Sequence, residues 1–135
     1  MAEATAEQEA LDAYSTIVTS VAEAVLPSVA SLRIGRGGRG FGGAGSGVVI
    51  TPDGFLVTSA HVVAAGGTAS ASFIDGTEHD VDVVGADPLS DLAVARARAD
   101  TLHPIRVGNA DQLRVGQLVV AIGNPMGFSG SVTSG

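Results

Sequence analysis

The chain has 135 residues and a formal net charge of −7, and it contains no cysteine and no lysine. A length of this size allows one hydrophobic core. The lack of cysteine excludes disulfides, thiol nucleophiles and cysteine-based zinc or iron–sulfur sites. The acidic balance argues against a general polyanion-binding protein, because phosphate binding depends on clustered lysine and arginine.

The first segment, residues 1–26, combines an acidic tail with an amphipathic helix. Residues 1–10 are small and acidic, which predicts a frayed tail. Apolar side chains then recur at three- and four-residue spacing, as in one helical stripe: Leu11, Tyr14, Val18, Val21 and Val25. Pro27 ends the helix. We favour docking of this stripe on the domain's own core, with another subunit of a homo-oligomer as the alternative.

These residues show neither a secretory leader nor a membrane-spanning segment. The N-terminus is acidic, whereas a leader begins with basic residues, and the apolar runs are too short to cross a bilayer. As written, the sequence is that of a cytoplasmic protein. If a leader or anchor has been removed, the compartment is extracytoplasmic, in the periplasm or cell envelope, so the localisation stays open.

After Pro27 the pattern changes to short β-branched runs separated by turn residues. Thr51–Gly54 (TPDG) and Asp75-Gly76 are tight-turn sequences that predict hairpins. Short strands at close spacing, with no alternation of strands and helices, indicate an all-β antiparallel barrel or sandwich. The predicted strands are Ser28–Ile34, Gly47–Thr51, Phe55–Thr58, Thr68–Ile74, Val81–Val84, Leu92–Val94, Gln117–Ile122 and Gly130–Thr133.

Residues 35–47, with the sequence GRGGRGFGGAGSG, form a low-complexity segment. Its scarcity of side chains predicts a mobile loop between two strands. The first six residues match G-x-G-x-x-G, but a strand follows instead of a helix, which argues against dinucleotide binding. Arg36 and Arg39 beside Phe41 are typical of a short RNA-binding box. Two arginines are a weak electrostatic footprint on so acidic a chain, so we expect no nucleic-acid partner.

His61 and Asp91 are the candidate site residues. His61 directly follows a predicted strand, and the small residues before it allow its imidazole to protrude. Asp91 interrupts an apolar run, and a carboxylate entering a β-core is costly unless it is hydrogen-bonded. A neutral histidine that donates from Nδ1 would satisfy it. Such a pair is the orienting half of a Ser-His-Asp relay.

The remaining two histidines give weaker signals. His79 shares its run with Glu78, Asp80 and Asp82, a polar strand face that can hold a metal but is more often solvated. His103 lies in a predicted loop. We therefore expect no metal ligand and no cofactor.

Four segments occur in an order that resembles the HtrA/Deg-type trypsin-like serine proteases. They are Gly45–Ile50 (GSGVVI), Leu56–Val63 (LVTSAHVV), Asp87–Val94 (DPLSDLAV) and Val115–Pro125 (VGQLVVAIGNP). The resemblance implies two six-stranded antiparallel β-barrels with the active site between them. It also implies that His61 is the general base and Asp91 its orienting carboxylate, in peptide-bond hydrolysis for protein quality control.

The sequence departs from this family at the nucleophile. The family carries a Gly-Asn-Ser-Gly-Gly-type motif in the second barrel, and no G-x-S-G-G follows Asp91 here. Ser129, in Gly127–Ser131 (GFSGS), is the nearest imitation, and we interpret it as a turn residue. The resemblance therefore predicts a first barrel over residues 27–114 and the first strands of an incomplete second barrel over 115–135.

Two functions follow from these expectations. The first is the N-terminal part of a serine endopeptidase that acts on protein or peptide substrates and is inactive without its nucleophile. The second is a non-catalytic half-protease module that binds partner chains, or its own copies, through exposed strand edges.

Overall fold

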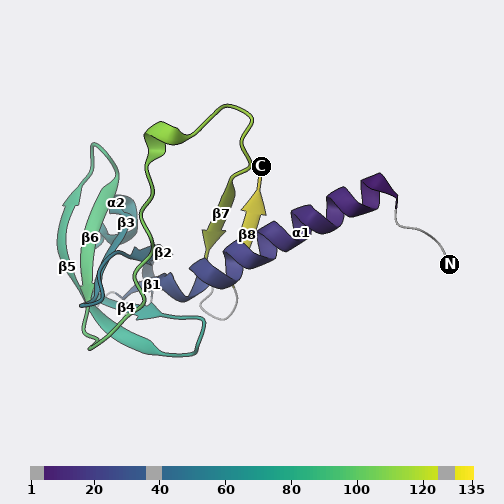
Figure 1. Ribbon diagram of the computed structural model, residues 1–135. Coiled ribbons are helices and arrows are strands. Elements are labelled where there is room, and N and C mark those ends of the chain that lie inside the picture. Colours follow the sequence, from purple (N-terminus) through teal and green to yellow (C-terminus); the bar gives the residue numbers. More distant parts are fainter. Residues whose placement is uncertain (1–4, 36–40, 125–129) are drawn as a thin grey trace.

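The computed structural model describes residues 5–35, 41–124 and 130–135. Figure 1 shows the chain from the long N-terminal helix to the last strand. The elements in chain order are α1 (Ala6–Val25), η1 (Leu26–Ser28), β1 (Val29–Gly35), β2 (Phe41–Val49), β3 (Phe55–Ser59), α2 (Ala60–Val63), β4 (Thr68–Ser72), β5 (Glu78–Asp87), β6 (Leu92–Ala97), η2 (Ala110–Gln112), β7 (Val120–Gly123) and β8 (Ser131–Ser134).

Strands β1 to β6 form a closed barrel in the order β1-β2-β3-β6-β5-β4. Every neighbouring pair is antiparallel, and β1 closes the barrel by pairing with β2 on one side and β4 on the other. Closure gives each of these strands two partners, so that the barrel itself has no open edge. The predicted fold class, an all-β trypsin-like antiparallel barrel with an N-terminal helix, is confirmed. Of the two architectures left open, barrel and sandwich, the structure shows the barrel.

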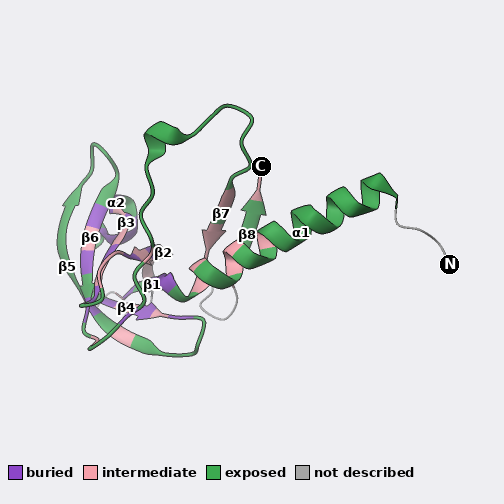
Figure 2. Cartoon of the chain, in the orientation of Figure 1, coloured by how far each residue is buried: buried purple, intermediate pink, exposed green. Residues whose placement is uncertain are grey.

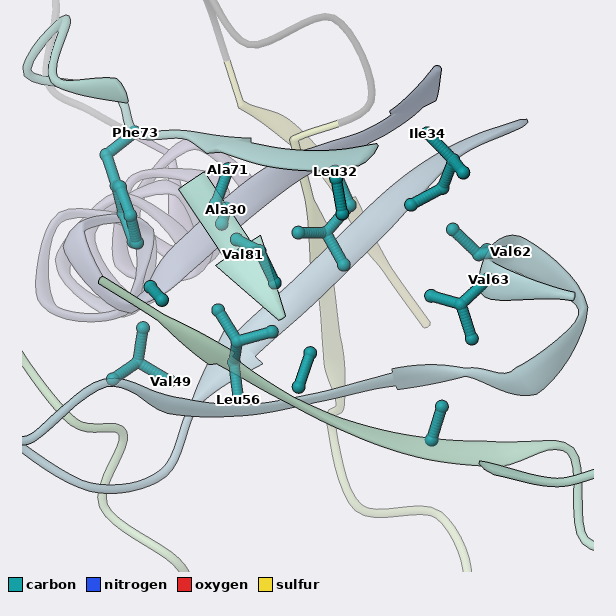
Figure 3. Packing of buried hydrophobic residues seen from close by; sticks show 14 of the residues in the cluster. Ala30, Leu32, Ile34, Val49, Leu56, Val62, Val63, Ala71, Phe73 and Val81 are labelled. Atoms are coloured by element: carbon teal, nitrogen blue, oxygen red, sulfur yellow. The ribbon is translucent and has the colours of Figure 1, made fainter. Parts of the chain in front are cut away.

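The core fills the inside of this barrel (Figures 2 and 3). Leu32, Ile34, Val49 and Leu56 are among its most completely buried apolar side chains, each at most 2% exposed. Alternate residues of β6 are inward-facing alanines, which leave room for the larger side chains from the opposite wall. The barrel is therefore packed with side chains and encloses no channel.

Two predicted turns occur where the sequence placed them. Gly54 closes the Thr51–Gly54 turn by donating to the Thr51 carbonyl, and its φ of 106° is one that glycine adopts without a penalty. Gly76 has a φ of 87° and donates to the carbonyl of Phe73. Both hairpin predictions are confirmed.

The N-terminal prediction is wrong in one respect, because the helix begins at Ala6 instead of Leu11. The side chain of Thr5 accepts a hydrogen bond from the backbone N–H of Gln8, which caps the helix. Glu7 and Glu9 lie in the first turn, where carboxylates interact favourably with the helix dipole. The acidic residues assigned to a tail are therefore an N-terminal helical turn.

The predicted mobile loop over residues 35–47 is also wrong for much of its length. The segment from Phe41 belongs to β2, which pairs with β1 from Phe41 to Val48 with one irregularity in register. Residues 36–40, which include both arginines of the loop, lie outside the described residues. The high glycine content predicted a flexible loop, whereas in β2 the glycines permit the close approach of α2 that is described with the site.

Strands β7 and β8 form a separate two-stranded antiparallel sheet. Helix α1 runs beside this sheet (Figure 1), and the hydroxyl of Tyr14 is hydrogen-bonded to that of Ser134. The apolar stripe of α1 is covered only near its C-terminal end, where Val18, Val21 and Val25 are half-buried. Leu11 is 54% exposed. Apart from η1, the element that α1 chiefly contacts is β7, so this helix lies mainly against the β7–β8 sheet and not, as expected, against the barrel core.

Candidate active site

Helix α2 carries His61 and is anchored by its other side chains. It directly follows β3, and both Val62 and Val63 are buried in the barrel core. Figure 3 shows these two valines pointing from α2 into the core. His61 points the opposite way, and its side chain is 73% exposed. The buried valines thus fix a short helix whose imidazole faces solvent.

Glycines of β2 allow α2 to approach the barrel wall. A Cβ atom at Gly43 would lie 2.7 Å from the carbonyl oxygen of Val62, and one at Gly45 would lie 2.6 Å from its Cγ2. Both separations are shorter than real Cβ contacts, so any side chain here would displace α2. Sequence reasoning missed this role. The available signal was the alternation of Gly43, Gly45 and Gly47, which places all three on one face of a strand.

Asp91 ends the turn that connects β5 to β6. Its φ is +56°, and it is the only non-glycine residue with a positive φ in the part of the chain that the structure describes. Aspartate enters this left-handed region more readily than most residues, because its short polar side chain can form local hydrogen bonds. A backbone conformation of this kind reverses the chain and turns the Asp91 side chain toward α2.

Three hydrogen bonds join Asp91 to the start of α2. Its Oδ2 lies 2.7 Å from His61 Nδ1, and its Oδ1 accepts from the His61 backbone N–H at 2.9 Å. Its carbonyl oxygen accepts from the backbone N–H of Ala60 at 3.0 Å. Together these contacts bind the imidazole and satisfy two N–H groups at the helix N-terminus that have no intrahelical partner.

These contacts hold the pKa of Asp91 below its ordinary range. The hydrogen bond from the His61 backbone N–H is the largest cause, and the one from the His61 ring is next. Asp91 is therefore ionised at neutral pH and can only accept hydrogen bonds. Nδ1 of His61 must then be the donor in the hydrogen bond to Asp91. In a neutral ring the free lone pair therefore lies on Nε2. The exposed Nε2 can accept a proton from a neighbouring hydroxyl.

Ser46 connects the barrel to the chain that follows β7, a contact that sequence reasoning did not find. Its hydroxyl accepts from the backbone N–H of Asn124 at 2.9 Å. Its carbonyl oxygen accepts from the hydroxyl of Thr58 at 2.8 Å. Thr58 belongs to β3, the strand that leads into α2. Ser46 therefore links residues 78 positions apart close to the base of the His61 helix.

The remaining histidines, His79 and His103, lie away from the His61–Asp91 pair. Strand alternation places His79 on the face opposite to Glu78, Asp80 and Asp82, which corrects the expected shared face. His79 instead packs edge-on against Phe73 and, like His103, lines a cavity of about 400 Å³. Among the described residues, no three His, Asp or Glu side chains lie close enough to hold a metal ion.

Two of the sequence predictions concern residues that the structure does not describe. Ser129, the imitation nucleophile, is one of residues 125–129, and the Gly/Arg segment is largely residues 36–40. Over residues 5–35, 41–124 and 130–135, no helix is both long enough and apolar enough to cross a membrane.

Comparison with known proteins is consistent with this geometry. Residues 45–135 match the family model described as a trypsin-like peptidase domain. A DegP-like periplasmic serine endoprotease of Halomonas elongata is 45% identical over 91 residues, which cover 67% of this chain and 19% of the relative. Its counterpart in Brucella suis is 47% identical over 93 residues, which cover 67% of this chain and 18% of that protein.

A solved structure agrees over a longer stretch. The HtrA-type protease AlgW, solved in a variant form with a tripeptide, superposes with a TM-score of 0.78 at 32% sequence identity. The match covers 87% of this chain and 38% of AlgW. The chain therefore belongs to the trypsin-like peptidases and, within them, to the serine proteases of HtrA/Deg type. It spans about a fifth of the length of the curated relatives it matches.

Proposed function

We propose that this chain supplies the general-base half of an HtrA-type serine endopeptidase that acts on protein or peptide substrates. The observation that carries the proposal is the 2.7 Å contact between His61 Nδ1 and Asp91 Oδ2, on a ring whose other nitrogen faces solvent. The family membership supports the same function, and the endoprotease descriptions of the relatives supply the substrate class.

In the proposed reaction, His61 Nε2 removes the proton from a serine hydroxyl as the serine oxygen attacks the substrate carbonyl. The imidazolium that forms is stabilised by the ionised Asp91. When the tetrahedral intermediate collapses, the same proton passes from Nε2 to the leaving amine. An acyl-enzyme remains, and water hydrolyses it with His61 again acting as the base.

We propose that the serine nucleophile and the oxyanion-hole donors come from residues other than these 135. The sequence after Asp91 contains no G-x-S-G-G motif. The chain by itself is then unable to hydrolyse peptides, although it carries the base and its carboxylate. Ser129 is proposed to be a turn residue and takes no part in the chemistry.

Labelling with a fluorophosphonate probe tests this division of roles. The 135-residue chain is expected to remain unlabelled. A longer protein that joins it to a segment carrying the G-N-S-G-G motif is expected to label, and His61→Ala should abolish that labelling. Labelling of the 135-residue chain would contradict the assigned absence of a nucleophile. Labelling of the longer protein that survives His61→Ala would contradict the role of His61.

We further propose a division into residues 1–26 as the acidic tail and amphipathic helix, 27–114 as the first barrel and 115–135 as the first strands of a second barrel. The separation of β7 and β8 from the closed barrel supports the last boundary. An extracytoplasmic location is also proposed, since the DegP-like relatives are described as periplasmic.

A second candidate function is a non-catalytic module that binds other chains through strand edges. The closed barrel offers no edge, but the two-stranded β7–β8 sheet leaves the outer side of each strand unpaired by any described strand. Apolar side chains nearby, Leu118 and Val119, are 39% and 53% exposed. Sedimentation of the chain over a range of concentrations tests this function. A monomer at every concentration would count against it, and a homo-oligomer would support it.

A further inference from the structure

We propose that Asp87 is a positioning residue for the His61–Asp91 pair, acting through the turn that joins β5 to β6. Asp87 is the last residue of β5 and pairs with Leu92, the first residue of β6. Residues 88–91 form the turn between them. Asp91 is therefore held at the end of a short connection whose shape decides where its carboxylate lies.

Both carboxylate oxygens of Asp87 bind this turn. Oδ1 accepts from the backbone N–H of Leu89 at 3.0 Å, and Oδ2 accepts from the hydroxyl of Ser90 at 2.8 Å. These bonds join the start of the turn to the residue immediately before Asp91. The arrangement is an Asx-type turn reinforced by a second bond, and it favours one backbone path through residues 88–91.

Packing cannot supply this restraint, because the turn has almost no buried side chain. Leu89 is fully exposed, and Leu92 is 55% exposed. The side chains of His61 and Asp91 are 73% and 49% exposed. A side chain held by packing is fixed by its neighbours, whereas an exposed one is fixed only by its hydrogen bonds and its backbone. Besides the three hydrogen bonds that Asp91 itself makes to α2, the Asp87 bonds are thus a restraint within the turn that favours the left-handed backbone of Asp91.

The chain contains a matched control for this inference. Asp75, in the turn between β4 and β5, also accepts from a backbone N–H two residues on, that of Thr77 at 2.9 Å, and from the Thr77 hydroxyl at 2.7 Å. The two turns share this chemistry, but only the Asp87 turn leads to Asp91. Asp75→Ala therefore removes an equivalent set of bonds without acting on the pair.

Only the importance of Asp87 for catalysis rests on the proposed function. The test of its positioning role measures the His61–Asp91 pair directly. Nitrogen-15 NMR of the histidine rings reports which nitrogen of His61 carries the proton. In the unchanged chain we expect the Nδ1–H tautomer to dominate, and Asp91→Ala should remove that preference. Loss of Asp87's two bonds should lower the ratio of paired to unpaired imidazole by up to roughly 25-fold, since each of the two hydrogen bonds changes an equilibrium by about fivefold.

Four variants separate the possible outcomes. Asp87→Ala should lose most of the Nδ1–H preference, and Ser90→Ala, which keeps the Leu89 bond, should lose less. Asp87→Asn should retain it, because its amide can accept from Leu89 and donate to Ser90 Oγ. Asp75→Ala should behave as the unchanged chain. If Asp87→Ala does not fold, the contrast between Ser90→Ala and Asp75→Ala decides the question.

An unchanged tautomer ratio in folded Asp87→Ala, or the same ratio in Ser90→Ala and Asp75→Ala, would overturn the positioning role. An Asp87→Asn variant as impaired as Asp87→Ala would show that charge acts instead of turn geometry, and would also overturn it. If the His61 tautomer ratio is the same in Asp91→Ala as in the unchanged chain, the proposed function fails instead. The two failures are therefore distinguishable.

Discussion

The barrel and the β7–β8 sheet satisfy the same two requirements, hydrogen bonding and burial, to very different degrees. In the barrel every strand has two neighbours, and the apolar side chains of its core are at most 8% exposed. The β7–β8 sheet has two strands, and none of their residues is fully buried. A two-stranded sheet is marginally stable by itself. The barrel that carries His61 and Asp91 therefore satisfies its own hydrogen bonding and burial, whereas the sheet depends on α1 and on whatever else covers it.

The largest expected effect comes from truncating leucine in the two regions. Leu56, which is 0% exposed in the barrel, should lose about 2–5 kcal/mol of unfolding free energy as Leu56→Ala. Leu118→Ala, next to the exposed sheet, should change it by about 0.5 kcal/mol or less. Urea titration monitored by circular dichroism measures both. Equal losses would show that the two regions are equally packed and would end the contrast.

A smaller effect is expected where β2 meets α2. Gly45→Ala should cost about 1–3 kcal/mol, because its Cβ would lie 2.6 Å from Val62 Cγ2. Val62→Ala removes that methyl group, so the double variant should lose clearly less than the sum of the two single losses. Additive losses would mean that the glycine is not needed for the approach of α2.

Gly85→Ala is the control for this pair, since its Cβ would meet no atom within 4 Å. We expect a change of about 0.5 kcal/mol or less. A loss as large as that of Gly45→Ala would show that the contact with Val62 is not the cause, since the lower unfolded-state entropy of alanine by itself favours folding.

The free energy of unfolding should depend on pH through the Asp91 carboxyl. The pKa of Asp91 is lowered by the hydrogen bonds from the His61 backbone and ring. A lowered folded-state pKa gives a stabilisation that is present above the unfolded-state pKa and is lost as the pH falls through the folded-state value. The stability difference between the unchanged chain and Asp91→Asn should therefore close in acid. Urea titrations from neutral to acidic pH measure it, and a difference that widens in acid would contradict the sign.

The smallest effect is expected for an ion pair on the outside of the barrel. Arg98 and Asp82 form two hydrogen bonds of 2.8–2.9 Å, but their side chains are 67% and 59% exposed. Exposed pairs contribute little, because water and salt screen them. Asp82→Asn should leave the urea midpoint within experimental error. A clear loss would show that surface charge, besides the core, distinguishes the barrel from the sheet.

Local sequence signals predicted the parts of the fold that depend on local chemistry. The Thr51–Gly54 and Asp75-Gly76 turns are visible because proline and glycine fix particular backbone angles. Closure of the barrel between β1 and β4 was not predictable from spacing, because it depends on pairing between distant residues. The strand character of Gly43 and Gly45 was hidden because their function is to leave space for Val62.

The candidate site was predictable to a similar extent. The predicted His61–Asp91 pair is present, with the two side chains 2.7 Å apart. The reason given for it was wrong, because Asp91 does not enter the β-core but lies in an exposed turn, with its side chain 49% exposed. Their catalytic roles stay predictions. The bonds from Asp87 to Leu89 and Ser90 were not foreseen, because a polar residue at a strand end gives the same pattern whether or not it shapes the turn.

The barrel by itself assembles an imidazole oriented by a carboxylate, and the tautomer of His61 tests this most directly. Nitrogen-15 NMR of the 135-residue chain at neutral pH should show the proton on Nδ1, held by Asp91, with Nε2 unprotonated. Asp91→Ala should remove this preference while the barrel remains folded. A His61 ring with the proton mainly on Nε2, or a tautomer ratio indifferent to Asp91, would contradict the account.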